Sequence, residues 1–138
     1  MKKVVGFLLL IGFLCGPINA HSGKPKYQII IDTDGAIDDM RAISMFLAGN
    51  DIRVLALTCS QGTLLPDSVY VKVRSLLAGY HHEGIPVGRG DRVQAELPSW
   101  SSFAQKIKWG PASDSHNAKP YLSPQEILDR ASESCKEK

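Results

Sequence analysis

The chain has 138 residues, of which 43% are hydrophobic and 22% charged, and this composition excludes a disordered or fibrous protein. The length allows one domain or part of one. The formal charge of +2 comes from Lys2 and Lys3, because the other fourteen basic residues balance fourteen acids. A neutral chain beyond residue 20 gives no electrostatic basis for binding nucleic acid or an anionic membrane.

The first twenty residues have the pattern of a signal peptide. Two lysines precede an apolar run over residues 4–15, and Ala20 offers a small residue for cleavage. The run is too short to span a bilayer comfortably. We therefore expect a signal peptide at 1–20 and a mature domain at 21–138. The protein would be exported, periplasmic or secreted, with no membrane association after cleavage.

Beyond this leader, the hydrophobic pattern predicts alternating strands and helices. A β-branched run at 27–31 that ends in acids is typical of a buried parallel strand. Later segments predict a helix at 38–48, a strand at 53–57, a helix with the apolar stripe Val69, Val73, Leu76, Leu77 and Tyr80, and a brief strand at 85–87. This order predicts an α/β fold, a parallel β-sheet with flanking helices.

The remainder of the chain predicts a long loop and one more helix. Residues 88–122 are rich in Gly and Pro, with a helical turn expected near 103–108. Ser123 to Glu126 form a capping-box pattern that starts a helix, with Ile127, Leu128 and Ala131 on its apolar side. Because an α/β chain normally enters another strand after such a helix, we expect a partial domain. Its unpaired sheet edge would favour association into a homo-oligomer.

Two cysteines, Cys59 and Cys135, remain after the predicted cleavage. An oxidising compartment would permit a bridge between them, but the sequence alone leaves that pairing open.

Four carboxylates lie within eight residues at the expected carboxyl end of the first strand: Asp32, Asp34, Asp38 and Asp39. Ligand sites of open α/β sheets lie at that end. Gly35 lets the chain turn, so that the last two acids come back beside the first two at a helix N-terminus. Such crowded charges repel one another unless a cation neutralises them, and a hard divalent cation with oxygen ligands is the simplest solution.

Simpler interpretations explain only part of this cluster. One or two of the acids would serve as helix caps, which leaves the others unexplained. An EF-hand loop starting at Asp32 fails, because its fifth and twelfth positions would be Ala36 and Ile43. A phosphate-binding loop fails as well, since the turn has one glycine and no lysine.

The segments DTDGAIDD, NDIRVLALTCSQGT and GIPVGRGD, in this order, resemble the inosine-uridine preferring nucleoside hydrolases. The resemblance is clearest over residues 27–92. It implies hydrolysis of the N-glycosidic bond of a small-molecule nucleoside, assisted by Ca²⁺.

The resemblance also implies roles for individual residues. Asp34 would bind calcium and act as the catalytic general base, and Asp39 would be a second calcium ligand. Asp38 would hydrogen-bond the ribose hydroxyls, with Asp32 as a supporting acid. Where the family usually has an Asn that touches the ribose, this chain has Thr63, which we expect in the substrate site. The family completes its site from segments beyond a position like Lys138, so we expect activity impaired by truncation.

Two alternatives stay open at this point. The sequence from Asp32 to Gly35 also fits the opening of a haloacid-dehalogenase-like, Mg²⁺-dependent phosphatase, although that motif does not predict the Asp38–Asp39 pair. A non-catalytic remnant or binding module would keep the half-site without chemistry.

Overall fold

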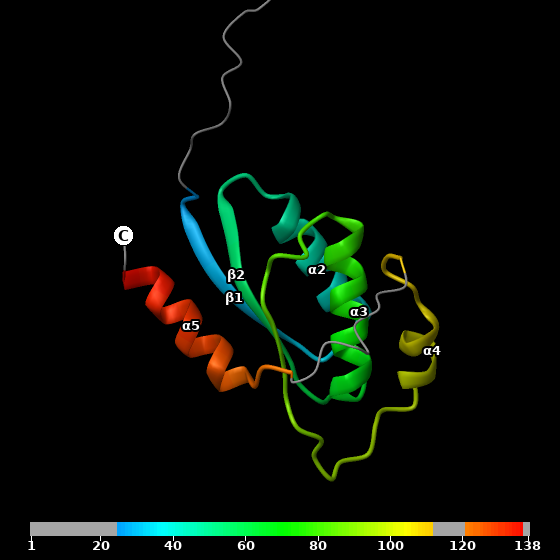
Figure 1. The fold of residues 1–138 in the computed structure, drawn as a ribbon. Helices are drawn as coiled ribbons and strands as arrows, with labels where there is room; N and C mark the ends of the chain where they lie inside the picture. Colours follow the sequence, from blue (N-terminus) through cyan, green and yellow to red (C-terminus); the bar gives the residue numbers. More distant parts are fainter. Residues whose placement is uncertain (1–24, 112–120, 137–138) are drawn as a thin grey trace, which may run out of the picture.

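The structure is a computed structural model that describes residues 25–111 and 121–136 (Figure 1). Its elements are β1 (Tyr27–Thr33), α2 (Ile37–Ala48), β2 (Ile52–Cys59), α3 (Pro66–Gly79), β3 (Val87–Arg89), α4 (Ser101–Lys106) and α5 (Pro124–Lys136). The predicted signal peptide lies outside the described residues. Within those residues, no helix combines the length and the apolar character that crossing a membrane requires.

The three strands form a parallel sheet in the order β1-β2-β3, which confirms the predicted α/β architecture. Along β1 and β2 the pairing runs from Tyr27 opposite Ile52 to Thr33 opposite Cys59, with an irregularity at Ile29/Ile30. β3 pairs with the last three residues of β2, and Gly88 of β3 also forms an isolated parallel bridge with Leu122. The carboxyl ends of the strands therefore meet at one edge of the sheet.

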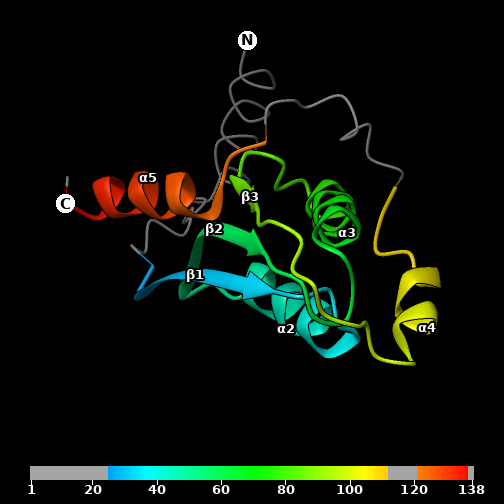
Figure 2. The same cartoon turned by 90° about the horizontal axis from the view of Figure 1, so that it is seen from below.

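Helices cover both faces of this sheet. Figure 1 shows α5 on one side of the strands and α2 and α3 on the other, and Figure 2 shows α2 and α5 on opposite sides of β1 and β2. The α2 and α3 side holds the main core, which includes Met40, Ile43, Leu57, Leu76 and Leu77. The α5 side buries a much smaller cluster, formed by Ala56, Ile127 and Ala131.

The predicted apolar stripe of α3 is confirmed except at its end. Val69, Val73, Leu76 and Leu77 are buried, but Tyr80 is 44% exposed. The helix stops at Gly79, and Tyr80 is its C-cap, so its side chain no longer follows the helical periodicity. Helical spacing therefore predicted the core face correctly only as far as the helix itself extends.

The third strand lies two residues later than predicted. It spans Val87–Arg89, whereas Ile85 belongs to a turn in which its N–H donates to the His82 carbonyl (3.0 Å). Pro86 has no N–H to donate to a ladder, although its carbonyl accepts from the Leu57 N–H (3.0 Å). Gly88 and Arg89, predicted as loop, are part of the strand.

The two C-terminal helices begin close to their predicted positions. The expected helical turn is α4, and Ser123 and Glu126 form the capping box of α5. In it, Glu126 Oε2 accepts from the Ser123 N–H (2.7 Å) and the Ser123 hydroxyl accepts from the Glu126 N–H (3.2 Å). Ile127 and Ala131 are buried as predicted, but Leu128 is 41% exposed.

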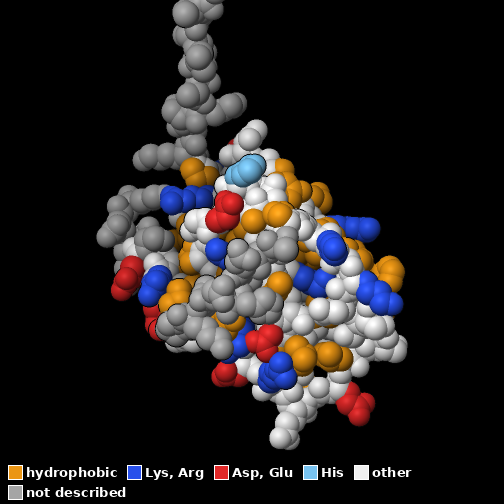
Figure 3. All heavy atoms as spheres, turned by 45° about the vertical axis from the view of Figure 1, so that its right-hand side comes forward, with side chains coloured by type: hydrophobic (Ala, Val, Ile, Leu, Met, Phe, Trp, Pro, Cys, Tyr) orange, Lys and Arg blue, Asp and Glu red, His pale blue; other side chains and the backbone are white. Residues whose placement is uncertain are grey.

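The face of the molecule seen in Figure 3 shows hydrophobic side chains with Lys and Arg side chains scattered among them. On the part of that face that is not grey, the Lys and Arg side chains form no single basic patch.

Candidate functional site

The acidic segment follows β1 directly and turns at Gly35. This glycine has φ +78°, a left-handed conformation, and a Cβ built on it would lie 3.1 Å from both Leu64 Cδ1 and Val69 Cγ2. A side chain at this position would be strained and crowded at once. The predicted turn at Gly35 is confirmed, and it anchors the acidic segment on the main core.

Asp34 is held by the loop that follows β2. Its Oδ2 accepts from the Thr63 N–H (2.8 Å) and the Thr63 hydroxyl (3.1 Å). Its Oδ1 accepts from the Ala36 N–H (2.9 Å), and its carbonyl accepts from the Leu64 N–H (3.2 Å). Each carboxylate oxygen of Asp34 therefore has a fixed direction.

Asp39 lies in the first turn of α2 and reaches back to the strand. Its Oδ2 accepts from the Thr33 hydroxyl (2.9 Å) and from the Asp34 N–H (3.3 Å). A carboxylate in the first turn of a helix is favoured by the helix dipole. The structure thus brings Asp34 and Asp39 together, as the sequence predicted.

Asp32 is bound to the end of the neighbouring strand. Its two oxygens accept from the Thr58 hydroxyl (2.6 Å) and the Ser60 hydroxyl (2.9 Å). The register explains the first contact, because Asp32 is the pairing partner of Thr58. These contacts fit the supporting role expected for Asp32, since they tie the ends of β1 and β2 together.

Asp38 and Thr63, the two predicted substrate contacts, lie in different surroundings. Asp38 is exposed on α2. Among the residues that the structure describes, none forms a hydrogen bond with its side chain. Thr63 is 6% exposed, and its hydroxyl is turned onto Asp34. Asp38 is thus available to a ligand, whereas Thr63 is engaged inside the protein.

Four residues that support the acids were not predicted from the sequence: Thr33, Thr58, Ser60 and Gly62. The hydroxyls of the first three donate to Asp39 or Asp32. Thr58 and Ser60 were predictable in part, because small polar residues at the end of a parallel strand face the end of its neighbour. Gly62 gave no such signal, since its importance depends on how closely Asp34 approaches it.

The oxygen atoms at this site are of the type that binds calcium. Asp34 and Asp39 offer carboxylate oxygens, the ligand type that calcium prefers. However, the described ranges contain no group of three or more His, Cys, Asp or Glu side chains placed to hold a metal. Two carboxylates supply fewer oxygens than calcium takes, so an ion bound here would need further oxygens from water, substrate or other protein groups.

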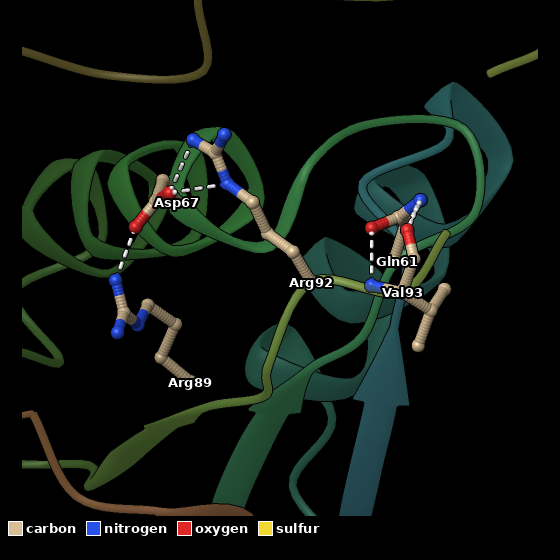
Figure 4. Close-up of polar contacts among 5 residues, drawn as sticks. All are labelled: Gln61, Asp67, Arg89, Arg92 and Val93. Atoms are coloured by element: carbon tan, nitrogen blue, oxygen red, sulfur yellow. Dashed lines mark hydrogen bonds and ion pairs between the residues drawn. The ribbon is translucent and has the colours of Figure 1, made fainter. Parts of the chain in front are cut away.

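Residues 91–95 are fastened beside this edge by the Gln61 side chain (Figure 4). Its amide nitrogen donates to the carbonyls of Val93 (3.0 Å) and Ala95 (3.1 Å), and its oxygen accepts from the Val93 N–H (2.9 Å). Gln61 is next to Gly62 and Thr63 in the chain. The segment after β3 thus rests on the same loop that holds Asp34.

Ion pairs with Asp67 also connect this segment and β3 to α3. Asp67 accepts from Arg92 Nη2 (2.8 Å) and pairs with Arg89 (Figure 4). Hydrogen bonds from Arg92 and Arg89 hold the pKa of the Asp67 carboxyl below its usual value, against the effect of partial burial. The Arg89 guanidinium also lies 4.4 Å from the centre of the Tyr121 ring. Arg89 therefore links β3 to α3 and to the chain leading into α5.

A cavity of about 630 Å³ lies away from the acids, between α3 and residues 105–111. Lys72 lines it and donates to the carbonyls of Gln105 (3.0 Å) and Ile107 (2.5 Å). Burial lowers the pKa of Lys72. None of the four acids lines this cavity, so it is separate from the acidic site.

The two cysteines of the described chain are not bonded to each other. Cys59 is buried and Cys135 is exposed, and both are free thiols. Burial, and secondarily the charge of Asp32, raises the pKa of Cys59 far above its ordinary value. Cys59 is therefore an inert core residue in this structure.

Comparisons with known proteins bear directly on this site. The sequence profile of the inosine-uridine preferring nucleoside hydrolases matches residues 29–123, which include all four acids and the loop around Thr63. A search of curated proteins found no match.

Solved structures of nucleoside hydrolases resemble this chain as well. A plant nucleoside hydrolase, the PpNRh1 enzyme, is 37% identical over 55% of this chain and 24% of its own, with a TM-score of 0.48. A purine-preferring ribonucleoside hydrolase from Gardnerella vaginalis is 20% identical over 80% of this chain and 36% of its own, with a TM-score of 0.60. An inosine-guanosine nucleoside hydrolase is 23% identical over 81% of this chain and 34% of its own, with a TM-score of 0.47.

This chain spans about a quarter to about a third of the length of those enzymes. This chain shares the fold of the Gardnerella enzyme. The family profile covers more than half of the residues of this chain. The match also favours the nucleoside hydrolase interpretation of the Asp motif over the phosphatase one. The chain belongs to the inosine-uridine preferring nucleoside hydrolase family.

Proposed function

We propose that this chain carries the acidic half-site of a nucleoside hydrolase that cleaves the N-glycosidic bond of ribonucleosides with the help of Ca²⁺. The observation that carries the proposal is the pairing of Asp34 and Asp39 at the carboxyl end of β1, where the Asp34 N–H donates to Asp39 Oδ2 (3.3 Å). Family membership supplies the reaction class.

In this mechanism Asp34 and Asp39 would hold the calcium ion, which supplies Lewis acidity toward water and the ribose diol when bound. Asp34 takes a proton from the attacking water. The water oxygen forms a bond to the anomeric carbon of the ribose as the bond from that carbon to the nucleobase nitrogen breaks. The nucleobase leaves with the electron pair of that bond and takes a proton from solvent, so the products are ribose and the free base.

Of the other two acids, Asp38 acts on the sugar and Asp32 supports the strands. Asp38, exposed at the start of α2, accepts hydrogen bonds from the ribose hydroxyls. The transition state has positive charge on the sugar, and nearby carboxylates stabilise it. Asp32 contributes by holding the ends of β1 and β2 in register through Thr58.

We expect slow turnover from this chain by itself, because no three His, Cys, Asp or Glu side chains of the described residues are placed to hold a metal. Loosely held calcium positions water poorly. We also propose that the protein is exported, from the leader pattern of its first twenty residues.

The test combines ribose release from inosine and uridine with calcium-dependent thermal stability. Asp34→Asn should lower ribose release about 100-fold or more, because it removes the general base. It should also abolish the rise in melting temperature that calcium gives to the parent chain. Asp51→Asn is the matched control, because Asp51 is exposed immediately before β2, outside the acidic cluster.

Two results would contradict this function. Phosphate release from a phosphate ester with Mg²⁺, abolished by Asp32→Ala, would restore the phosphatase interpretation. A parent chain with neither calcium binding nor ribose release would be a non-catalytic member of the family.

A further inference from the structure

The loop between β2 and α3 contacts Asp34 directly, which the family resemblance did not imply. The resemblance placed Thr63 against the ribose, but here the Thr63 hydroxyl and N–H both donate to Asp34 Oδ2, at 3.1 and 2.8 Å. A hydroxyl has one proton to donate, so the Thr63 hydroxyl cannot donate to a ribose oxygen at the same time. Thr63 is also buried, with 6% of its surface exposed.

Gly62 provides the space that this arrangement needs. A Cβ at residue 62 would lie 2.3 Å from Asp34 Oδ2 and 2.7 Å from Asp34 Cβ. Real Cβ atoms essentially never approach other atoms this closely, so any side chain here would force Asp34 to turn. The glycine is required by the carboxylate and not by its own backbone, because its φ lies outside the left-handed region.

From these contacts we propose that Gly62 and Thr63 form a cradle that positions the Asp34 carboxylate, and that Thr63 is a positioning residue and not a ribose contact. The inference rests on the proposed function, in which Asp34 is both a calcium ligand and the general base. With Oδ2 taken by two donors from Thr63, the carboxylate plane is fixed. Calcium and water then meet a pre-oriented group, which lowers the cost of binding them.

The first test asks whether the two residues act on each other, independently of any activity. The stability of Thr63→Val, Asp34→Asn and the double variant is measured by denaturant unfolding without calcium, as a double-mutant cycle. Valine keeps the shape of threonine and loses the hydroxyl. We expect the effects to be non-additive by about fivefold or more in the unfolding equilibrium constant. Additive effects would overturn the pairing.

The second test asks whether this contact serves the site. Calcium affinity is measured by titration calorimetry on the full chain. Thr63→Val should weaken calcium binding about tenfold, as is usual for a lost partner of a metal ligand, and Thr63→Ser should recover most of the loss. Where turnover is measurable, Thr63→Val should lower kcat and leave KM nearly unchanged. An increase in KM with unchanged calcium affinity would show a ribose contact and overturn the proposal.

Glycine substitutions provide an independent comparison. Gly62→Ala should weaken calcium binding at least about tenfold, because Asp34 must turn away from the new methyl group. Gly84→Ala is the matched control, since a Cβ at residue 84 meets nothing within 4 Å. Equal effects of the two substitutions on calcium affinity would contradict the cradle.

The outcomes separate this inference from the proposed function. Strong calcium binding and ribose release in the parent, together with an additive cycle, would keep the function and overturn the cradle. A non-additive cycle in a parent that neither binds calcium nor releases ribose would contradict both the proposed function and the positioning role of Thr63. The contact between Thr63 and Asp34 would then serve folding alone.

Discussion

On the face that α2 and α3 cover, buried side chains form a continuous core. The buried cluster under α5, among the residues that the structure describes, consists of Ala56, Ile127 and Ala131. On β1, Ile30 remains 39% exposed. Hydrophobic stabilisation grows with the apolar area removed from water, so the first face contributes most of the stability. The acidic site depends on the same face, because Gly35 packs against Leu64 and Val69.

The largest effect should come from a cavity in the main core. Leu77 is fully buried on α3, and Leu77→Ala should destabilise the whole protein by about 3 kcal/mol, from lost burial and an unfilled space. Denaturant unfolding followed by circular dichroism measures this. A loss below about 1 kcal/mol would show that this face is less tightly packed than the structure indicates.

A substitution of equal chemistry on the other face should act more locally. Ile127 is also fully buried, but it belongs to the small cluster under α5. Ile127→Ala should remove amide-exchange protection from α5 and change global stability by about 1 kcal/mol, because α5 can detach while the main core persists.

Leu128→Ala is the control for this effect, since Leu128 lies on the same helix and is exposed. Equal loss of protection in α3 and α5 after Ile127→Ala would show that the two faces unfold as one unit.

The smallest effect concerns the pH dependence of the ion pairs that Asp67 forms with Arg92 and Arg89. The folded-state pKa of Asp67 is lowered by Arg92 and Arg89, so this acid contributes stability above its unfolded-state pKa of about 4. That contribution is lost as pH falls through the folded-state pKa. It should not exceed about 1 kcal/mol, because the ion pairs are partly exposed.

Comparing the parent with Asp67→Asn at pH 6 and pH 3 measures this contribution. The parent should be more stable at pH 6, and the two proteins should converge at pH 3. A difference that grows toward acid would contradict the sign.

The sequence predicted the elements well because local rules govern them. Helical spacing found the buried face of α3, and the Ser123–Glu126 pattern found the start of α5, since a capping box needs only neighbouring residues. The errors occurred where an element ended. Tyr80 lies beyond the last helical turn, and Pro86 delays β3 because it cannot donate to the ladder. The predicted association through an unpaired sheet edge stays a prediction.

For the site, the sequence by itself determined that four acids follow the first strand and turn at Gly35, because residues close in the chain stay close in space. Only the tertiary structure decided what each acid contacts. The register of β1 and β2 gives Asp32 its partner Thr58, and the loop after β2 brings Thr63 and Gly62 onto Asp34. Such contacts join residues 26 to 29 positions apart, and they depend on strand pairing and chain packing that no local pattern specifies.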